Sequence, residues 1–356
     1  MNKARVIIVG AGINGLATAW ALLRRGYEVE VFDKGAIPNP VASSYDEHRM
    51  TRHCYGTMHD YAEKMRETFR LWDTLFADIG ARHFDPLPFV ALERETAGWI
   101  EASAASMDRL GVGWRNIPPD EIAQTFPMIR TDGLTRAAEF QGTGMLFPIR
   151  ILTDLVVYLA ASGVIFHQGT EVTAVDPETG RAVADGKTYS ADHVVIAAGA
   201  WVTRLLPELT ELVVPSRQPT MYMAPPPAFG ALWRTAPLFL DFGIHSGSYG
   251  MPPRPGTRLK IGDHVFTRRG DPDASRVASD ADIERLIAAA RITFTDFDAY
   301  IPLERKACYY TVTDDEHFII RPCGARGTVL SACSGHGFKL APSSGEEVAK
   351  LVEAAG

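Results

Sequence analysis

The fold of this chain is decided by residues 6–33, which read VIIVGAGINGLATAWALLRRGYEVEVFD. The apolar run Val6–Val9 is typical of a short buried strand, and the stretch Leu16–Leu23 predicts a helix. Gly26 is expected to end that helix, and Tyr27–Phe32 alternates as a second strand. The stretch therefore predicts a strand, a helix and a second strand, with a glycine-rich turn between the first two.

The turn carries the spacing Gly-x-Gly-x-x-Gly at Gly10, Gly12 and Gly15, and Asp33 closes the second strand. The first glycine permits a tight turn, the second lets the backbone approach a pyrophosphate, and the third lets helix and strand pack closely. The N-terminus of the helix offers free N–H groups to phosphates, and Asp33 can accept hydrogen bonds from ribose hydroxyls. The sequence predicts one dinucleotide site, of FAD or NAD; the alternative is a glycine-rich turn with a solvated Asp33.

Length and composition exclude several classes of protein. The chain has 356 residues, which suits about two domains, and its 46% hydrophobic and 22% charged residues are ordinary for a globular protein. A net charge of -7 disfavours nucleic acid and anionic membranes as partners. No signal peptide, membrane span or metal site is expected, and four cysteines without a CxxC pair indicate reduced thiols in the cytoplasm.

Another apolar strand is expected at residues 193–201 and ends in Ala-Gly. It is typical of strands that return to the nucleotide-binding sheet of two-domain flavoproteins. On the strand before it, Glu171 and Val172 are expected beside the adenine. Residues 43–56 read SSYDEHRMTRHCYG. Arg49 and Arg52 would share one face of a helical turn there, either as a solvated basic turn or as an anion or flavin site.

Five segments together resemble one family, the monomeric sarcosine oxidase and N-methyltryptophan oxidase group of D-amino-acid-oxidase-type flavoproteins. The motifs occur in the family's order and cover nearly the whole chain. They are Arg-x-x-Arg-His-x-Tyr-Gly at 49–56, Leu-Lys-x-Gly-x-His at 259–264, Ala-Cys-x-Tyr-Thr at 307–311, Asp-Glu-His-Phe-Ile-Ile at 315–320 and Ser-Gly-His-Gly-Phe-Lys at 334–339.

The resemblance implies FAD, joined by a thioether between the flavin 8α-methyl group and Cys308. A nearby cation such as Lys306 would favour the thiolate that this bond requires. The remaining cysteines, Cys54, Cys323 and Cys333, are expected to be ordinary buried thiols. The residues expected around FAD are Gly10, Gly12, Ile13, Asn14, Gly15, Asp33, Lys34, Ser43, Arg49, Val172, Ala198, Gly199, Trp201, Cys308, Gly335, His336, Gly337, Phe338 and Lys339.

The resemblance also implies roles around the substrate. Arg52 and Lys339 match the pair that grips the substrate carboxylate. Lys260 matches the lysine that activates oxygen, where a cation stabilises developing negative charge. The residues expected beside the flavin ring and the bound amine are Arg49, His264, Tyr249 and Tyr310. The helix expected after Ser334–Lys339 would direct its N-terminus at the flavin.

The resemblance therefore implies an FAD-dependent oxidase of a small amino acid, most typically a secondary amine: an N-alkyl amino acid, a cyclic imino acid or an iminodiacid. Hydrogen passes from the substrate to flavin N5, an imine forms, and O2 becomes H2O2. The alternatives are a dehydrogenase with another electron acceptor and a catalytically silent flavin-binding protein. A monomer is expected, with a homodimer as the alternative.

The chain departs from the family pattern in one stretch and at several positions near the expected pocket. The family's Ser-His-His-Gly-Asp-Thr is here Ser-Ser-Tyr-Asp-Glu-His at residues 43–48, which changes the surroundings of the flavin. A family methionine over the pocket falls at about Leu240. His245 and Arg254 are new near the expected pocket, and an added cation there would suit a substrate with a second carboxylate.

The fold class expected is α/β, with a Rossmann-like FAD-binding domain interleaved with a mainly antiparallel-sheet substrate domain. The FAD-binding domain is expected at residues 1–83, 147–216 and 307–356, and the substrate domain at 84–146 and 217–306. Helices are expected at 153–161, 281–290 and 344–354, and a further helix has a buried face formed by Tyr61, Met65, Phe69, Trp72 and Phe76.

Overall fold

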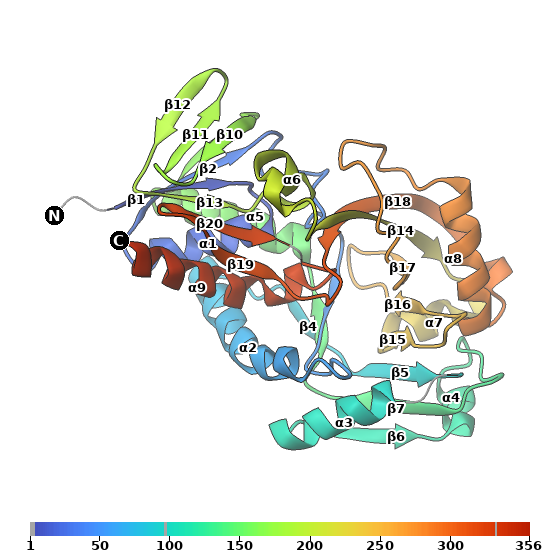
Figure 1. The fold of residues 1–356 in the computed structure, drawn as a ribbon. Coiled ribbons are helices and arrows are strands. Elements are labelled where there is room, and N and C mark those ends of the chain that lie inside the picture. Colours follow the sequence, from blue (N-terminus) through green and yellow to red (C-terminus); the bar gives the residue numbers. More distant parts are fainter. Residues whose placement is uncertain (1–3, 96–97, 332) are drawn as a thin grey trace.

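A computed structural model describes residues 4–95, 98–331 and 333–356 (Figure 1). One half of the molecule is built on a six-stranded sheet of order β19-β20-β13-β1-β2-β9. All of its neighbouring strands are parallel except the pair β19 and β20. The strands are β1 (Arg5–Val9), β2 (Glu28–Asp33), β9 (Ile165–Gln168), β13 (His193–Ile196), β19 (Ile319–Gly324) and β20 (Gly327–Ser331).

The glycine motif joins β1 to α1 (Ile13–Leu23) and explains how closely they lie. A Cβ atom on Gly15 would lie 1.9 Å from the Gly10 carbonyl oxygen, and one on Gly10 would lie 2.4 Å from the Ala197 carbonyl oxygen. Only glycine permits these contacts, because any side chain would force the backbones apart. The predicted strand, helix and strand are confirmed, although α1 begins three residues before the expected Leu16.

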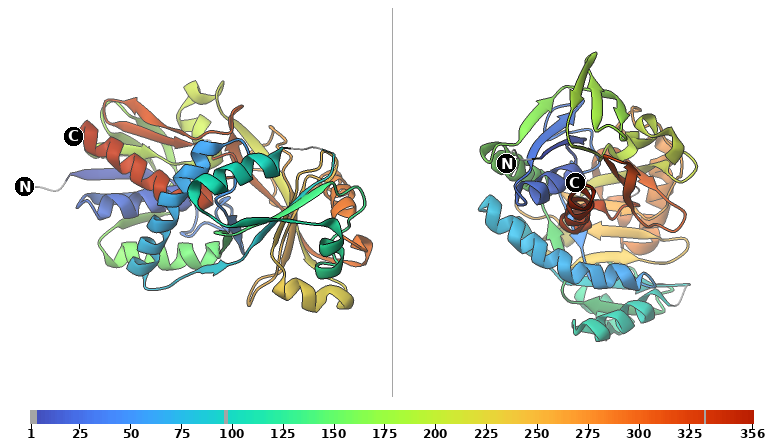
Figure 2. Two further views of the ribbon diagram at one scale, coloured as in Figure 1. Left: turned by 90° about the horizontal axis from the view of Figure 1, so that it is seen from below. Right: turned by 60° about the vertical axis from the view of Figure 1, so that its left-hand side comes forward.

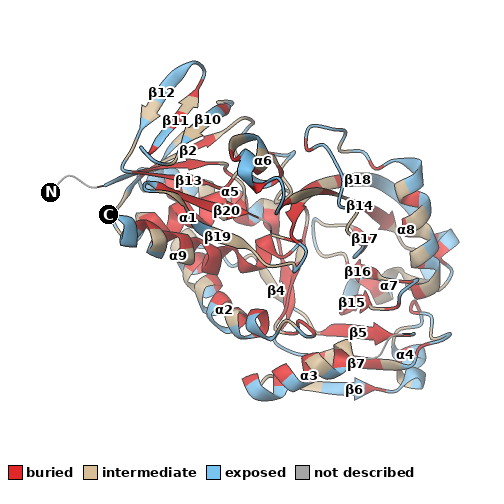
Figure 3. Cartoon of the chain, viewed as in Figure 1, coloured by how far each residue is buried: buried red, intermediate tan, exposed pale blue. Residues whose placement is uncertain are grey.

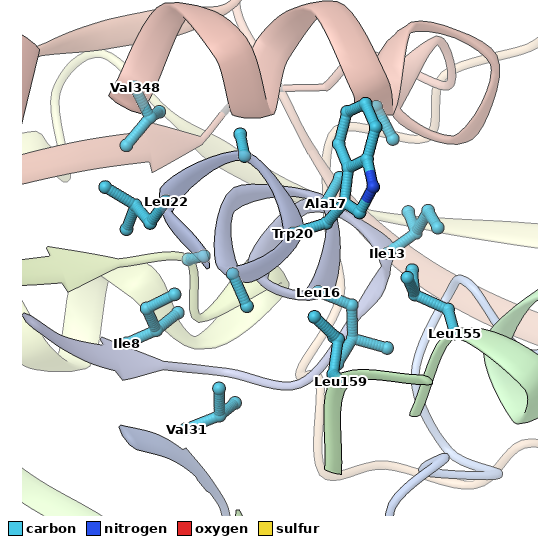
Figure 4. Close-up of a cluster of buried hydrophobic side chains, with 14 of the residues drawn as sticks. Ile8, Ile13, Leu16, Ala17, Trp20, Leu22, Val31, Leu155, Leu159 and Val348 are labelled. Carbon is cyan, nitrogen blue, oxygen red and sulfur yellow. The ribbon is translucent and has the colours of Figure 1, made fainter. Parts of the chain in front are cut away.

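The two faces of the six-stranded sheet are covered differently, as the alternation along β1 requires. Val6 and Ile8 face a core formed with α1, α2 (His59–Ile79), α5 (Pro148–Ala161) and α9 (Gly337–Ala355). In Figure 4, Leu16 and Trp20 of α1 lie within this core, near Leu155 and Leu159 of α5. Ile7 and Val9 face the small sheet β10 (Val172–Asp176), β11 (Arg181–Ala184) and β12 (Lys187–Ser190).

The other half is an eight-stranded sheet of order β18-β14-β17-β16-β15-β5-β7-β6, antiparallel except for β15 beside β5. Its strands are β5 (Phe89–Glu93), β6 (Trp114–Ile117), β7 (Arg136–Phe140), β14 (Val214–Ala224), β15 (Leu238–Asp241), β16 (Ser248–Met251), β17 (Leu259–Asp263) and β18 (Ile301–Val312). One face packs against α4 (Pro119–Thr125), α7 (Pro227–Thr235) and α8 (Asp280–Thr293), and the other packs against α3 (Trp99–Leu110).

A three-stranded sheet, β3 (Arg49–Thr51), β8 (Gly144–Leu146) and β4 (Phe84–Pro86), lies where the two halves meet. Its strand β3 corrects one expectation, because Arg49 lies on a strand and Arg52 follows it, with no helical turn between them. Figure 2 shows that β1 and the C-terminal end of α9 lie on the side away from the eight-stranded sheet.

The expected helices exist, with different starting points. The helices expected at 153–161 and 281–290 are observed as α5 and α8, and α2 buries Tyr61, Met65, Trp72 and Phe76 while Phe69 stays partly exposed. The expected start of the last helix at 344 is wrong. Helix α9 begins at Gly337, so the glycine-rich segment itself forms the first turn.

Buried residues are concentrated in the two large sheets and on the helix faces turned toward them (Figure 3). Among residues 4–95, 98–331 and 333–356, no helix combines the length and the apolar character that a membrane span requires.

Replacing Gly15 with alanine tests the packing of α1 on β1. We expect Gly15→Ala to lower the free energy of unfolding by about 3 kcal/mol or more, because the new methyl group overlaps the Gly10 carbonyl. Gly113→Ala is the matched control, since its Cβ would meet only the flexible Gln141 side chain at 3.6 Å. Urea unfolding of both variants measures the difference, and equal stabilities would contradict this account.

Candidate active site

One large cavity, of about 470 Å³, lies between the six-stranded and the eight-stranded sheets. Its wall begins at the Gly10–Asn14 turn, follows residues 197–201 and β18, and ends at Gly335–Lys339. Of the residues predicted to bind FAD or the substrate, all line this cavity except Gly15, which acts through packing, and His245 and Arg254. The structure therefore brings together residues from nearly the whole length of the chain.

The glycine turn leaves the N-terminus of α1 open to the cavity. A Cβ atom on Gly12 would meet only the Ser44 hydroxyl oxygen, at 3.2 Å, so little besides that hydroxyl covers the turn. Asp33 holds the turn in place: its carboxylate accepts hydrogen bonds from Ala11 N and Gly35 N, both at 2.9 Å, and from Asn39 Nδ2 at 2.7 Å. Helix N-termini of this form bind phosphate groups.

Ser44 is a residue that the glycine motif does not reveal. Its hydroxyl oxygen accepts a hydrogen bond from Ile13 N at 3.0 Å, which is the first free N–H of α1. The hydroxyl therefore lies where a phosphate oxygen would bind. The only signal in the sequence is that Ser44 belongs to residues 43–48, the stretch that departs from the family pattern.

The opposite end of the nucleotide region is lined by Lys34, Val172 and Trp201. The Lys34 ammonium lies 4.2 Å from the centre of the Trp201 ring and 2.6 Å from Asp273 Oδ1. Trp201 Nε1 donates a hydrogen bond to the same Asp273 oxygen at 2.8 Å. Asp273 thus fixes both side chains at this end of the cavity.

Cys308 lies on β18 and lines the cavity beside β14. The neighbouring Lys306 ammonium donates a hydrogen bond to the Tyr45 carbonyl at 2.8 Å. Burial raises the pKa of the Cys54 thiol to about 12 and that of Cys323 to about 11, and neither lines the cavity. Burial also raises the pKa of Cys333, which does line it. Cys308 and Cys333 are therefore the two thiols in reach of a bound cofactor.

Arg52 and Lys339 form a buried pair of cations in the same cavity, 7% and 8% exposed. The Arg52 guanidinium carbon lies 5.0 Å from the centre of the Tyr55 ring, and the Lys339 ammonium lies 5.3 Å from it. Arg52 Nε donates to the Cys54 carbonyl at 2.9 Å. Within the described residues, neither cation forms an ion pair with a carboxylate. Buried charges are costly without a partner, so the pair favours an anionic ligand.

The aromatic and imidazole groups near this pair are uncharged. Burial, together with Arg52 and Lys339, lowers the pKa of His264 to about 3. Burial raises the pKa values of the Tyr249 and Tyr310 phenols. At neutral pH the phenols can donate hydrogen bonds but cannot take up a proton, and His264 is a weak base. They are suited to shaping a pocket around an amine.

Lys260 on β17 is 2% exposed, and its ammonium lies 2.6 Å from Asp46 Oδ2. Burial lowers the pKa of Lys260 well below its usual range and Arg49 adds to the shift, while Cys308 and Glu47 oppose it. Asp46 also forms an ion pair with Arg49 and accepts a hydrogen bond from the Tyr222 phenol. From the sequence, Asp46 differs from other residues only as a departure from the family pattern. No feature near it in the sequence indicates that Lys260 is its partner.

Two predicted pocket residues lie elsewhere. Arg254 does not line the cavity; its Nε donates to Asp85 Oδ2 at 2.6 Å, and its other nitrogens bind backbone carbonyls. His245 is exposed and is also outside the cavity wall. The expectation that either residue grips a second substrate carboxylate is therefore wrong. Leu240 does line the cavity, as expected.

The residues present fit FAD. The cavity continues from the open N-terminus of α1 to Cys308, and it passes polar atoms that are buried without a hydrogen-bond partner within the described residues. These atoms are Asn14 Oδ1 and both ring nitrogens of His336. A bound group with hydrogen-bonding atoms along its length would satisfy them.

Solved structures share the fold over almost the entire chain. The structure of NikD, described as an unusual amino acid oxidase essential for nikkomycin biosynthesis, matches with a TM-score of 0.83 at 24% identity, covering 99% of this chain and 94% of that chain. L-proline dehydrogenase from P. horikoshii matches with a TM-score of 0.84 at 19% identity, with the same coverage.

Known sequences give a consistent result. Monomeric sarcosine oxidase of Bacillus sp. (strain B-0618) is 28% identical over 97% of this chain and 91% of its own length. N-methyl-L-tryptophan oxidase of Yersinia pestis (strain Pestoides F) is 27% identical over 98% of this chain and 94% of its own length. The model of the FAD dependent oxidoreductase family matches residues 5–351. With its glycine turn, its interleaved sheets and this match over nearly its full length, the chain belongs to the FAD dependent oxidoreductase family.

Proposed function

We propose that this protein is an oxidase of small amino acids that carry a secondary amine, with O2 as the electron acceptor. The observation that carries the proposal is the buried pair Arg52 and Lys339, which lacks a carboxylate counter-ion within the described residues and lines the same cavity as the glycine turn. The relatives named for sarcosine and for N-methyl-L-tryptophan add support, because both substrates are N-methyl amino acids.

The two cations would bind the substrate carboxylate in complementary ways. The planar guanidinium of Arg52 offers two parallel N–H donors, and the compact ammonium of Lys339 offers a point charge. Arg52 is fixed by the Cys54 carbonyl and by the aromatic rings around it, so the carboxylate is held in one orientation. Tyr249 and Tyr310 would close the pocket around the amine and keep water away.

When bound, FAD supplies the redox chemistry: it accepts the hydrogen from the carbon next to nitrogen and passes the electrons to O2. The α1 turn with Gly12 and Ser44 would hold the pyrophosphate. The N-terminus of α9, at Gly337, would stabilise negative charge on the ring system. Lys260 would keep a positive charge where oxygen becomes negative during its reduction.

We also propose a thioether between Cys308 and the flavin, and the two-domain division predicted above. The position of Cys308 on the cavity wall supports the thioether. The two large sheets support two domains, although the proposed boundaries after residues 216 and 306 fall inside β14 and β18. With these boundaries, β14 and β18 would each belong partly to both domains, although both strands are part of the eight-stranded sheet.

A substrate panel tests the proposed function. The flavin-loaded protein is mixed without oxygen with sarcosine, other N-methyl amino acids, proline, pipecolate and iminodiacetate. We expect at least one secondary-amine monocarboxylate to bleach the flavin absorbance, and admission of O2 to restore it with release of hydrogen peroxide. Bleaching without peroxide would indicate a dehydrogenase, and no bleaching by any amine would indicate a silent flavin-binding protein.

Removing either cation tests the substrate site. We expect Arg52→Met and Lys339→Met each to lower kcat/KM at least 100-fold, about 3 kcal/mol, because one charge-assisted contact to the carboxylate is lost. Arg181→Met, which changes an exposed arginine on β11, is the control and should match the wild type. An unchanged kcat/KM in both cation variants would place the carboxylate elsewhere.

Acid precipitation tests the flavin linkage. The wild-type pellet should stay yellow, because a thioether survives denaturation, and Cys308→Ser should release the colour into the supernatant. Cys333→Ser is the matched variant, since its thiol also lines the cavity. Loss of colour from the Cys333→Ser pellet, with retention in the Cys308→Ser pellet, would move the linkage to Cys333.

A further inference from the structure

Asp46 is a buried carboxylate at the junction of the two halves of the molecule, 3% exposed. It has three charged or polar side-chain partners: the Lys260 ammonium at 2.6 Å from Oδ2, the Arg49 guanidinium and the Tyr222 phenol. Glu47 N donates a further hydrogen bond to Oδ1 at 2.8 Å. Such complete coordination leaves the carboxylate little freedom to rotate.

The partners come from three separate elements. Lys260 on β17 and Tyr222 on β14 are directly opposite each other in the antiparallel ladder, so the carboxylate contacts both members of one cross-strand pair. Arg49 comes from β3. Asp46 lies just after Ser44 in the chain. It therefore connects this segment to strands β14 and β17 of the eight-stranded sheet.

Asp46 is the acid that forms an ion pair with Lys260, whereas Glu47 and Cys308 raise the pKa of this lysine without such a contact. Arg49 and Lys260 carry two positive charges, and Asp46 is the acid that forms ion pairs with them within the described residues. Glu47 is committed to Arg258, with Nε and N of that arginine both 2.7 Å from its carboxylate. The charged and titratable groups that face Lys260 are Asp46, Glu47, His48 and Arg49 from the first segment, Tyr222 from β14, and Lys306 and Cys308 from β18.

Without Asp46, Lys260 would face the cations Arg49 and Lys306 in a buried site. Removing one partner of a buried ion pair leaves an uncompensated charge that costs several kcal/mol, and an amine in that position loses its proton. His48 on this segment cannot replace the carboxylate, because an imidazole carries no negative charge; burial lowers its pKa to about 4 and leaves it neutral.

We propose that Asp46 is a positioning residue of this oxidase: its carboxylate holds the Lys260 ammonium at the cavity wall and supplies the counter-charge that keeps this buried lysine cationic for the reduction of O2. The inference rests on the proposed function, in which Lys260 acts toward oxygen. The family pattern given above has glycine where this chain has Asp46, so that pattern does not account for this carboxylate.

The first test measures the charge of Lys260 directly. The flavin-loaded protein is prepared with 13C at the lysine side-chain ε carbons, and the Lys260 signal is identified by its absence in Lys260→Met. In the wild type we expect this signal to be that of a charged amine at pH 7 and to titrate at higher pH. In Asp46→Asn we expect the Lys260 ammonium to lose its proton at a pH at least one unit lower, which corresponds to a tenfold lower proton affinity.

The controls separate charge from fold. Glu47→Gln, next to Asp46, removes a carboxylate that contacts Arg258 and acts on Lys260 without an ion-pair contact, so it should lower the titration pH of Lys260 by less than Asp46→Asn does. Asp46→Gly places the family's glycine at the site and should behave as Asp46→Asn does, which covers the case that the asparagine variant misfolds. A Lys260 titration that is the same in wild type, Asp46→Asn and Asp46→Gly would overturn the proposal.

The second test is a double-mutant cycle on the rate at which O2 reoxidises the reduced protein. We expect Lys260→Met and Asp46→Asn each to slow it at least tenfold at pH 7, and Asp46→Asn to add little in the Lys260→Met background. If Lys260→Met alone has no effect, the oxygen role in the proposed function is wrong and the proposal falls with it. If Lys260→Met slows the rate but Asp46→Asn does not, only the role of Asp46 is wrong.

Discussion

The cost of burying positive charge organises this cavity. Six cationic side chains line it: Lys34, Arg49, Arg52, Arg204, Lys260 and Lys339. Lys34 and Arg204 form ion pairs with Asp273, and Arg49 and Lys260 form ion pairs with Asp46. Within the described residues, Arg52 and Lys339 form no ion pair with a carboxylate. Asp46 offsets part of the positive charge of Arg49 and Lys260 by direct contact. The side with Arg52 and Lys339 has no such carboxylate contact within the described residues. Since an unpaired buried charge is costly, a bound carboxylate would relieve the cost, and the proposed substrate follows from this imbalance.

The fold holds Arg52 and Lys339 in place at the cavity wall. The contact between Gly10 and Gly15 seats α1 on β1 and directs the N-terminus of α1 into the cavity. Lys339 is held on the first turn of α9, whose carbonyl at that residue accepts a hydrogen bond from Trp72 Nε1 at 2.9 Å. Arg52 follows β3, between the sheets. Rigid elements from both halves thus fix cations that would otherwise turn toward solvent.

The features that the sequence predicted well are local or carried by motifs. The glycine turn and its flanking elements follow from short-range sterics and from apolar periodicity, so residues 6–33 suffice for them. The cavity residues follow from motifs that keep their order along the chain. The start of α9 was placed too late because Ser334–Lys339 looks like a glycine-rich loop, whereas burial against α1 and α2 makes Gly337 the first helical residue.

The contacts that the sequence could not predict join residues far apart. Asp46 and Lys260 are separated by 214 positions, and no pattern in either neighbourhood indicates the pairing. The same holds for Arg254, whose partner Asp85 lies 169 positions away and holds it outside the cavity. In both cases the nearest opposite charge in space determines the position of the charged end of a long side chain. The sequence names the charged groups, and only the three-dimensional structure assigns their partners.

The proposed function depends on the buried pair Arg52 and Lys339 being a carboxylate site next to the flavin. The most direct measurement titrates the flavin-loaded protein with acetate and with acetamide, which have similar shapes and differ in charge, and follows the flavin absorption spectrum. The account predicts that acetate perturbs the spectrum with a saturable Kd, that acetamide does so at least tenfold more weakly, and that Arg52→Met abolishes the difference. Equal binding of the two compounds to the wild type would contradict it.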